Sequence, residues 1–478
     1  MTRFALGSPP DAIGAAEVRG SGMMIWVLLT IAMSEEYTES EGDKPMSVCG
    51  RPASSRSLCP HWLKRETMQR LRRIALVLLL CVLAVVLASA ASARVFLIDH
   101  AGSGDYVTIQ EGIDAASHGD TVLVMPGRYH EWLTMYSDKD GVTLMSSEGA
   151  DSTFIYALGS SAPSLLYVEA TGPETRVAGF TFEGNLANSH GGGVRCSSAG
   201  LTLEDCVIQD CSAGYRGGGI RLYEPVNVVI RRCVVRRNSA LEGGGLYAWK
   251  GQVLVEDTEF ADNWIIAFNG VDGGGAVLDE TEATFLRCTL RENYSISGHG
   301  DGLKGQGNST VWIEECSFQD QEGPAIYVSV GMANITNSVF TGNGDPLSES
   351  DAVVITGTAS SGLLACTDNV FSGNRTQAFY VYSQLPVLTG NSIDPNGHSV
   401  IRFHEDADAG TLDASGNWWG TTDPLEIAAL IHDCNDDPAI DSCVDFSDWC
   451  NDPSCSGTVT TVPEAEPTTW GAVKGLYR

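Results

Sequence analysis

The fold is decided by residues 191–245, which read GGGVRCSSAGLTLEDCVIQDCSAGYRGGGIRLYEPVNVVIRRCVVRRNSALEGGG. The tripeptide Gly-Gly-Gly opens this stretch, recurs twice within it, and occurs once more at Gly273–Gly275. Its period is 26, 26 and then 30 residues. Recurrence at this spacing is typical of a repeat protein, in which each unit buries its apolar face against the next.

Each glycine triplet is followed by a short segment of alternating residues, and a second such segment begins roughly ten residues later. Alternation with a period of two predicts strands. Aligning the second segments gives three apolar columns: Leu201, Val228, Val253 and Ala283; Leu203, Ile230, Val255 and Phe285; and Ile208, Val235, Phe260 and Leu290. Parallel strands stacked about 4.8 Å apart place like side chains on one another. We therefore predict an all-β chain whose residues 94–430 form a single-stranded right-handed parallel β-helix, or solenoid.

Small or polar residues form two further columns between and behind the apolar ones. The inner column is Cys206, Cys233, Thr258, Cys288, Cys316, Ser338 and Asn369. The corner column is Asp210, Asn238, Asn263, Asn293, Asp320, Asn343 and Asn374, and we expect its members to bond the backbone of the neighbouring coil. The glycines permit a positive φ and a close approach of backbones. Disulfides between Cys206 and Cys233, or Cys196 and Cys211, are open alternatives, whereas Cys288 and Cys316 are expected to be free thiols.

The first 93 residues are expected to be absent from the mature protein. Residues 1–67 contain no repeat, and residues 68–93 combine a basic segment, an apolar segment and a small-residue segment that ends in Ala-Ser-Ala. This pattern predicts a signal peptide cleaved between Ala93 and Arg94, with translation starting at Met68. The alternative is an uncleaved anchor, because residues 74–93 are uncharged. With cleavage, the protein is secreted or displayed on the outer cell surface and keeps no membrane span.

The chain is strongly acidic, with 60 acidic residues against 29 basic ones and a formal net charge of −31. Such a charge repels the phosphates of nucleic acids, so we expect no nucleic-acid partner. It attracts cations instead. This interpretation requires no cofactor. The acidic surface makes Ca²⁺ the expected ion if the protein binds a metal. A monomer is expected.

The start of the mature chain carries a family resemblance. Residues 106–131 read YVTIQEGIDAASHGDTVLVMPGRYHE, and within them Ile109, Ile113 and Ala116 share one helical face. This segment resembles the first coil of the pectinesterase and pectate-lyase-like β-helix superfamily, which implies a short helix that caps the open end of the solenoid. The central repeats are similar to those of polymorphic outer-membrane proteins, as in Phe260–Asn263. The resemblances cover about 94–430 and imply the fold, but this architecture hosts many activities.

The other end of the solenoid is marked by Trp418 and Trp419, within a segment that resembles the closing segment of secreted bacterial β-helix proteins. The tryptophans are predicted to seal the core, and stacking on sugar rings is the alternative. A Cys-rich closing segment, 431–456, and a flexible tail, 457–478, follow. Two disulfides, with three possible connectivities, are predicted for the cysteines of the closing segment, and zinc binding is the alternative. These cysteines are Cys434, Cys443, Cys450 and Cys455.

The start of a calcium loop is matched by Asp433, Asn435 and Asp437. Pro438 stands where the turn of such a loop requires glycine, so the match is incomplete. These three residues are nevertheless the candidate metal ligands of this chain.

The strand after each glycine triplet distinguishes inside from outside. Val194, Ile220, Leu246, Ala276 and Leu303 are predicted to point inward. The residue that follows each of them therefore lies on one outer face of the sheet. These residues are Arg195, Arg221, Tyr247, Val277 and Lys304. Asp279, two positions after Val277, lies on the same face. Arg and Lys suit carboxylate or sulfate groups, and aromatic rings stack on sugars. The predicted ligand-binding residues for an acidic polysaccharide are Arg195, Arg221, Tyr223, Tyr247, Trp249 and Lys304. The alternative is an ordinary surface whose aliphatic stems cover the sheet.

Evidence for catalysis is weaker. Gly298-His299-Gly300-Asp301 resembles a motif of the polygalacturonase family, but the aspartate motifs that accompany it there are missing, as is the pectinesterase signature. The weak catalytic candidates are His299, Asp301, Lys304 and Asp279. The sequence favours a non-enzymatic, glycan-binding or adhesin-like scaffold. A lyase or hydrolase acting on an acidic polysaccharide is the alternative.

Overall fold

The computed structural model describes residues 73–74, 76–78, 93–157, 163–187, 190–266, 273–295, 300–345, 352–356, 363–394, 399–405 and 407–455. The chain divides into two units, 1–93 and 94–478. The upstream segment 1–67, nearly all of the predicted signal peptide 68–93, and the tail 457–478 lie outside the described residues. Within the described ranges, no helix combines the length and the apolar character needed to cross a bilayer.

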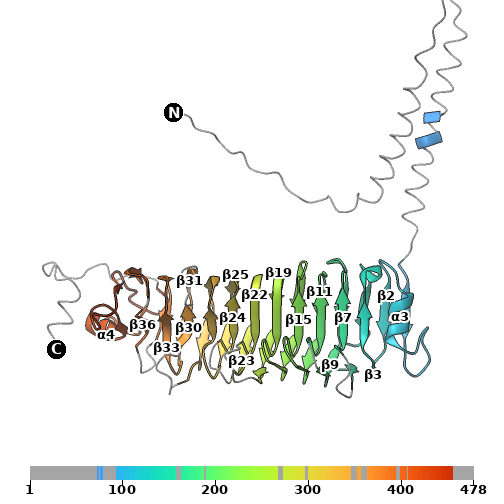
Figure 1. Ribbon diagram of the computed structural model, residues 1–478, viewed down its shortest axis with the longest axis horizontal. Coiled ribbons are helices and arrows are strands. Elements are labelled where there is room, and N and C mark those ends of the chain that lie inside the picture. Colours follow the sequence, from blue (N-terminus) through green and yellow to red (C-terminus); the bar gives the residue numbers. More distant parts are fainter. Residues whose placement is uncertain are drawn as a thin grey trace, which may run out of the picture. The chain divides into compact units, whose positions relative to one another are not determined.

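The second unit is a parallel β-solenoid, as predicted (Figure 1). Its largest sheet has 22 strands, which form two ladders. One ladder runs through β1 (Val95–Ile98), β2 (Thr121–Val124), β5 (Thr143–Ser146), β8 (Arg176–Ala178), β12 (Thr202–Glu204), β16 (Val228–Arg231), β19 (Leu246–Glu256), β22 (Ala276–Leu286), β25 (Ser309–Glu314), β28 (Gly331–Thr336), β31 (Leu363–Thr367) and β34 (Val387–Thr389).

The other ladder joins the first in β19 and β22, each of which is long enough to take part in both. It also contains β4 (Leu133–Met135), β7 (Leu166–Glu169), β11 (Val194–Ser197), β15 (Ile220–Tyr223), β24 (Leu303–Gln306), β27 (Ile326–Val328), β30 (Ala352–Thr356), β33 (Gln377–Val381), β36 (Ile401–Phe403) and β38 (Ile431–His432). This second ladder carries the candidate site.

Three smaller sheets complete the coils. The eleven-stranded sheet contains β3 (Gly127–His130), β6 (Thr153–Tyr156), β9 (Thr181–Glu183), β13 (Val207–Gln209), β17 (Val234–Arg236), β20 (Glu259–Ala261), β23 (Thr289–Arg291), β26 (Ser317–Gln319), β29 (Val339–Thr341), β32 (Val370–Ser372) and β35 (Ser392–Ile393). The four-stranded sheet contains β10 (Leu186–Ala187), β14 (Ser212–Ala213), β18 (Ser239–Ala240) and β21 (Trp264–Ile265). The last sheet pairs β37 (Gly410–Asp413) with β39 (Ser442–Asp445).

The predicted apolar columns are confirmed by the strand register. Leu203 pairs with Ile230, and Ile230 with Val255, in successive coils. All three are buried. The column of Ile208 continues into phenylalanines whose rings stack, with centroids 4.9 Å apart between Phe318 and Phe340 and 4.6 Å apart between Phe340 and Phe371. Like side chains therefore pack on like along the whole interior.

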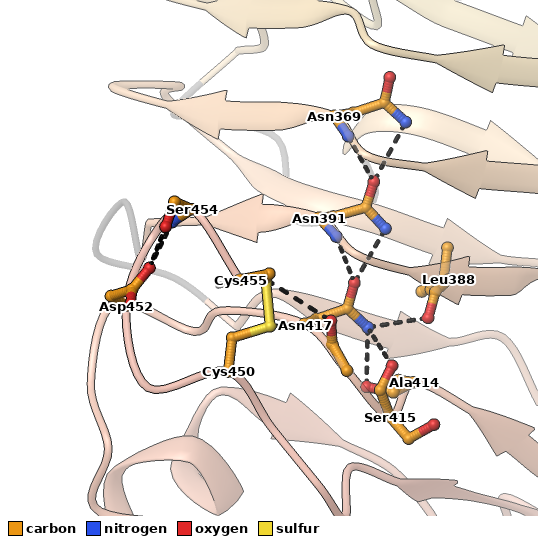
Figure 2. Close-up of a disulfide and its surroundings, with 11 residues drawn as sticks. Asn369, Leu388, Asn391, Ala414, Ser415, Asn417, Cys450, Asp452, Ser454 and Cys455 are labelled. Carbon is orange, nitrogen blue, oxygen red and sulfur yellow. Dashed lines mark hydrogen bonds between the residues drawn. A yellow bond between two sulfur atoms is a disulfide. The ribbon is translucent and has the colours of Figure 1, made fainter. Parts of the chain in front are cut away.

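Buried asparagines tie each coil to the next at one corner. The amide oxygen of Asn263 accepts hydrogen bonds from the backbone N–H and the side-chain amide of Asn238, both at 3.1 Å. Its own amide nitrogen donates to the Val235 carbonyl at 2.8 Å. A second corner carries the same ladder through Asn369, Asn391 and Asn417 (Figure 2). The amide oxygen and nitrogen of both Asn238 and Asn263 thus have partners, which removes the cost of burying them.

The sequence alignment was wrong at two places in the corner column. Asp210 and Asp320 are exposed residues with positive φ, at 56° and 53°. The buried positions belong to the residues that follow them, Cys211 and Gln321. The backbone N–H of Cys211 donates to Asn238, and the side-chain oxygen of Gln321 accepts from the backbone N–H of Asn293. The coil needs a left-handed residue before each inward corner, and aspartate tolerates that conformation.

The glycine triplets behave as predicted. Gly217 has a φ of +67°, which residues with a Cβ rarely adopt. At Gly218 a Cβ would lie 2.4 Å from the carbonyl oxygen of Ser239 in the next coil. The triplet therefore lets the chain turn tightly against its neighbour.

Both ends of the solenoid are covered. At the start, α3 (Ile109–Ala115) carries a capping box between Thr108 and Glu111, and buries Ile109 and Ile113 against the first coil. At the other end lie α4 (Pro424–Ala429) and the fully buried Trp419, whose ring packs against Phe446. The predicted cap helix is present, and of the two tryptophans predicted to seal the core Trp419 is fully buried and Trp418 is half-buried. A short 3-10 helix lies at Ser137–Lys139.

The Cys-rich segment forms two disulfides, Cys434–Cys443 and Cys450–Cys455. The second one lies beside Asn417, where the asparagine ladder ends (Figure 2). The cysteines of the coils are buried free thiols, so neither Cys206–Cys233 nor Cys196–Cys211 is bridged.

Candidate functional site

The predicted outward row exists on the second ladder. Arg195 pairs in register with Arg221, Arg221 with Tyr247, Tyr247 with Val277, and Val277 with Lys304. The register extends the row to Tyr167 before Arg195 and to Tyr327 after Lys304. The residues predicted to point inward are fully buried: Val194, Ile220, Leu246, Ala276 and Leu303.

A second row runs alongside it, two positions further along each strand. Tyr223 pairs with Trp249, and Trp249 with Asp279. The Tyr223 and Trp249 rings are 4.7 Å apart between centroids. Together the two rows place aromatic and cationic side chains on one face, as the sequence predicted.

This face is less open than the sequence suggested. Arg221 is 7% exposed, Val277 is 1% exposed and Tyr247 is fully buried. The cover is the corner before each strand, because a Cβ on Gly217 would lie 2.8 Å from the Cβ of Arg221. In the next coil, a Cβ on Gly243 would lie 3.0 Å from the Cβ of Tyr247. The row is flanked by the residues that precede the glycine triplets, His190, Arg216 and Glu242. We use the word groove for the row together with these three residues.

Arg195 and Arg221 lie in the groove without a carboxylate partner among the described residues. The Arg195 guanidinium lies 5.0 Å from the ring centroid of Tyr167, and that of Arg221 lies 5.3 Å from the ring centroid of Tyr223. The Nε of each arginine is buried and makes no hydrogen bond with described residues. Burial lowers the pKa of Arg221, and repulsion from Arg195 and Arg216 lowers it further. A bound anion would stabilise the charged form of Arg221 against both burial and the repulsion from its neighbouring arginines.

The next coil provides a different chemistry. Arg216 pairs with Glu242 at 2.5 Å and lies over the Tyr247 ring at 4.7 Å. The Tyr247 hydroxyl donates to Asp279 at 3.0 Å. Burial, and then the charge of Asp279, raises the pKa of Tyr247, so the phenol stays protonated at neutral pH. The groove is therefore cationic near Arg195 and Arg221 and acidic near Asp279.

The sequence interpretation missed His190. Its ring packs on Tyr215 at 5.4 Å between centroids, and its Nδ1 is buried without a hydrogen bond to described residues. Burial lowers the pKa of His190 to about 4, with further lowering by Arg221, Arg195 and Arg216. The available signal was its position directly before a glycine triplet, which Arg216 and Glu242 share.

The four catalytic candidates differ in what their side chains contact. His299 lies outside the described residues. Asp301 is buried and accepts a hydrogen bond from the Gly323 N–H at 2.6 Å, which supports a turn. Lys304 lies 5.7 Å from the ring centroid of Tyr327. Asp279 is joined to the groove residue Tyr247 by the hydrogen bond given above.

The candidate calcium ligands hold the local backbone. Asp433 is buried and accepts hydrogen bonds from Asn435 N–H at 3.0 Å and Val444 N–H at 3.0 Å. Asp437 accepts one from Ala439 N–H at 2.9 Å. In the part of the chain that the structure describes, no group of three or more His, Cys, Asp or Glu residues is placed to hold a metal ion. Binding of Ca²⁺ stays a prediction.

Comparisons with known proteins agree with this architecture. The model of the right handed beta helix region matches residues 166–297 and 274–418. Among solved structures, the A-module of mannuronan C-5 epimerase AlgE6 from Azotobacter vinelandii is 16% identical, with a TM-score of 0.44, and the match covers 72% of this chain and 94% of that one.

Two further structures match at similar levels. Pectin methylesterase from carrot is 12% identical with a TM-score of 0.35, covering 60% of this chain and 87% of that one. An alginate lyase from Paenibacillus is 15% identical with a TM-score of 0.34, covering 68% and 95%. No curated protein sequence matches the chain. At these identities the structural matches speak for the fold alone.

Proposed function

Because the chain belongs to the right-handed β-helix family, we propose that it is a scaffold that binds an acidic polysaccharide along the groove. The observation that carries the proposal is the state of Arg195 and Arg221. The chain contains 60 acidic residues, yet neither guanidinium group pairs with a carboxylate of the described residues, although the Nε of each is buried. Buried cations are normally paired, so an external carboxylate or sulfate is the partner that fits.

The shape of the site supports a polymer as the ligand. Cationic and aromatic side chains recur along the row from Tyr167 to Tyr327, one for each coil except at Val277. Successive coils are about 4.8 Å apart, so the row extends over several sugar units. Tyr223 and Trp249 add ring surface for sugars beside the charges.

The proposed location is extracellular or on the outer cell surface. The two disulfides fit an oxidising compartment. The predicted signal peptide at 68–93 supplies the route. Sequencing the amino terminus of the protein recovered from its native host tests this, and a start at Arg94 is expected.

The binding proposal is tested with the purified protein and a panel of acidic and neutral polysaccharides, with and without Ca²⁺. We expect retention on one or more acidic polysaccharides and no new chain ends. Absence of retention on every acidic polymer would overturn the proposal. Release of new reducing or unsaturated ends would favour the enzyme alternative.

The enzyme alternative rests on the hydrogen-bonded pair Tyr247 and Asp279 beside the arginines. A lyase or hydrolase needs a group that transfers a proton near a neutralised substrate carboxylate. If chain ends are released, Asp279→Asn is expected to abolish their release while retention on the polymer persists.

A further inference from the structure

We propose that His190, Arg195 and Arg221 form one pocket for a single anionic group of the glycan, a carboxylate or a sulfate, and that binding of this group places a proton on His190. The inference rests on the proposed function and narrows it. It assigns a role to His190 and makes ligand affinity dependent on pH.

The backbone places His190 beside the two arginines. Its neighbour Gly191 lies so close to β11 and β15 that a Cβ there would be 2.9 Å from the Cβ of Arg195 and 3.3 Å from that of Arg221. Gly191 is fixed in turn: its carbonyl accepts from the Ser164 hydroxyl at 2.6 Å, and its N–H donates to the Arg216 carbonyl at 3.0 Å. Hydrogen bonds to the Gly191 backbone therefore fix the residue next to His190.

Three nitrogen atoms in this pocket are buried without a hydrogen bond to described residues. They are Nδ1 of His190 and Nε of Arg195 and Arg221. An unpartnered buried donor costs about 1–3 kcal/mol, and a charged one more. The planar fork of arginine suits the oxygens of a carboxylate or sulfate. An oxyanion bound to the terminal nitrogens of such a fork would place its negative charge beside all three buried nitrogen atoms.

Positive charges are in excess around His190, and this excess favours binding of an anion. The charges that act on His190 are those of Arg195 on β11, Arg216 before β15 and Arg221 on β15, and its ring packs on Tyr215. The titratable groups that interact with these arginines or with their partners are Tyr167 and Glu169 on β7, Tyr223 on β15, Glu242 before β19, Tyr247 on β19 and Asp279 on β22. Glu242 is paired with Arg216, and Asp279 accepts from Tyr247. Glu169 interacts with Tyr167 on the same strand.

The sign of the linkage follows from these charges. In the free protein His190 is neutral at pH 7, because its pKa is lowered from 6.5 to about 4. A bound anion offsets the arginine charges and raises that pKa, so binding takes up a proton. If the pKa in the complex returns to 6.5, affinity at pH 5 is about 20-fold higher than at pH 7. Carboxylates of sugars and sulfates stay ionised over this range.

The experiment follows the His190 ring by NMR in the full chain, with histidine labelled by ¹⁵N and the signal assigned by its loss in His190→Gln. The pKa of His190 is measured in chloride, in sulfate and in a monosaccharide uronate. We expect a rise of one pH unit or more in sulfate, in the uronate, or in both, and the responding probe identifies the anion. Arg221→Gln should remove the rise. Arg237→Gln, which removes the same charge from another corner, should keep it.

Affinity for the retained polysaccharide is measured in parallel from pH 5 to pH 7. The wild type should bind about 20-fold more tightly at pH 5, while His190→Gln should show only the small general effect of a less negative protein. An unchanged His190 pKa in both probes would overturn the pocket. So would an equal pH dependence in wild type and His190→Gln, although the proposed function would then stand. A raised pKa in a protein that retains no acidic polysaccharide would keep the pocket and reject the proposed function.

Discussion

Arginines occupy two outer faces of this β-helix, and the two sets differ in what they contact. On the face of β8, β12 and β16, Glu204 accepts from Arg176 at 2.9 Å, from Arg231 at 2.8 Å and from Arg232. Arg232 also pairs with Asp205 at 2.8 Å. We call this group the ionic face. In the groove, by contrast, Arg195 and Arg221 contact only aromatic rings among the described residues.

The difference separates charges that stabilise the fold from charges kept for a ligand. On the ionic face the carboxylate is buried, while its arginine partners are each about 35–46% exposed and stay partly hydrated. In the groove Arg221 is the buried member, and nothing in the described chain neutralises it. The same residue type on the same scaffold therefore serves two purposes, which substitutions can separate.

The largest expected effect is on ligand binding. Replacing Arg195, Arg221 and Lys304 together with Gln should weaken binding of the retained acidic polysaccharide at least 100-fold, because several charge-assisted hydrogen bonds are lost at about 1.5–3 kcal/mol each. The matched control replaces Arg128, Arg237 and Arg287, which removes the same charge elsewhere. Equal losses in both triple variants, measured by calorimetry, would show that only overall charge matters.

The next effect concerns the ionic face. Glu204→Gln should lower the free energy of unfolding by about 2 kcal/mol, because it leaves several guanidinium groups with one neutral acceptor. Chemical denaturation measures this change. Glu148→Gln, at an exposed position, is the control and should stay within about 0.5 kcal/mol of wild type. Polysaccharide retention should be unaffected by Glu204→Gln.

A smaller effect is expected when the pH is lowered, because the contribution of Glu204 to stability depends on its charge. The hydrogen bonds from Arg176 and Arg231 lower the pKa of Glu204 from 4.5 to about 2. A lowered carboxyl pKa stabilises the folded state above pH 4.5, and this contribution is lost as the pH falls from 4.5 through 2. The difference in melting temperature between wild type and Glu204→Gln should therefore narrow between pH 5 and pH 2.5. A constant difference would contradict an ionic origin.

The smallest expected effect is that of an arginine substitution in the groove on the free energy of unfolding. Arg221→Gln should change the free energy of unfolding by no more than about 0.5 kcal/mol, because it removes a buried unpaired charge and one cation–π contact, whose effects oppose each other. Chemical denaturation again provides the measurement. A loss of 2 kcal/mol or more would place Arg221 with the structural arginines and weaken the case for a ligand.

Much of the fold could be predicted because one structural unit recurs. The column of Leu203, Ile230 and Val255 was evident from spacing alone, and so was the outward row that begins at Arg195. The corner column failed at Asp210, because aspartate suits the left-handed position and asparagine the buried one directly after it, and an alignment by residue type merges the two.

The groove was predicted less completely than the core. Strand alternation distinguishes the two faces of a sheet, but it does not show that the corners at Gly217 and Gly243 lie against Arg221 and Tyr247. Nor does it show that His190 lies beside arginines from two strands. Those facts depend on how turns pack between coils, which a repeat in the sequence does not encode.

The asparagine ladder has a consequence for how such a molecule changes in size. The coils of Asn238 and Asn263 present the same amide acceptor to one neighbour and the same donor to the other. A tandem duplication of residues 239–263 would therefore add one coil that both neighbours can bond. The groove would lengthen by about 4.8 Å and gain a second Tyr247 and Trp249, with both end caps untouched. Unequal recombination can thus change the length of the groove by one coil at a time.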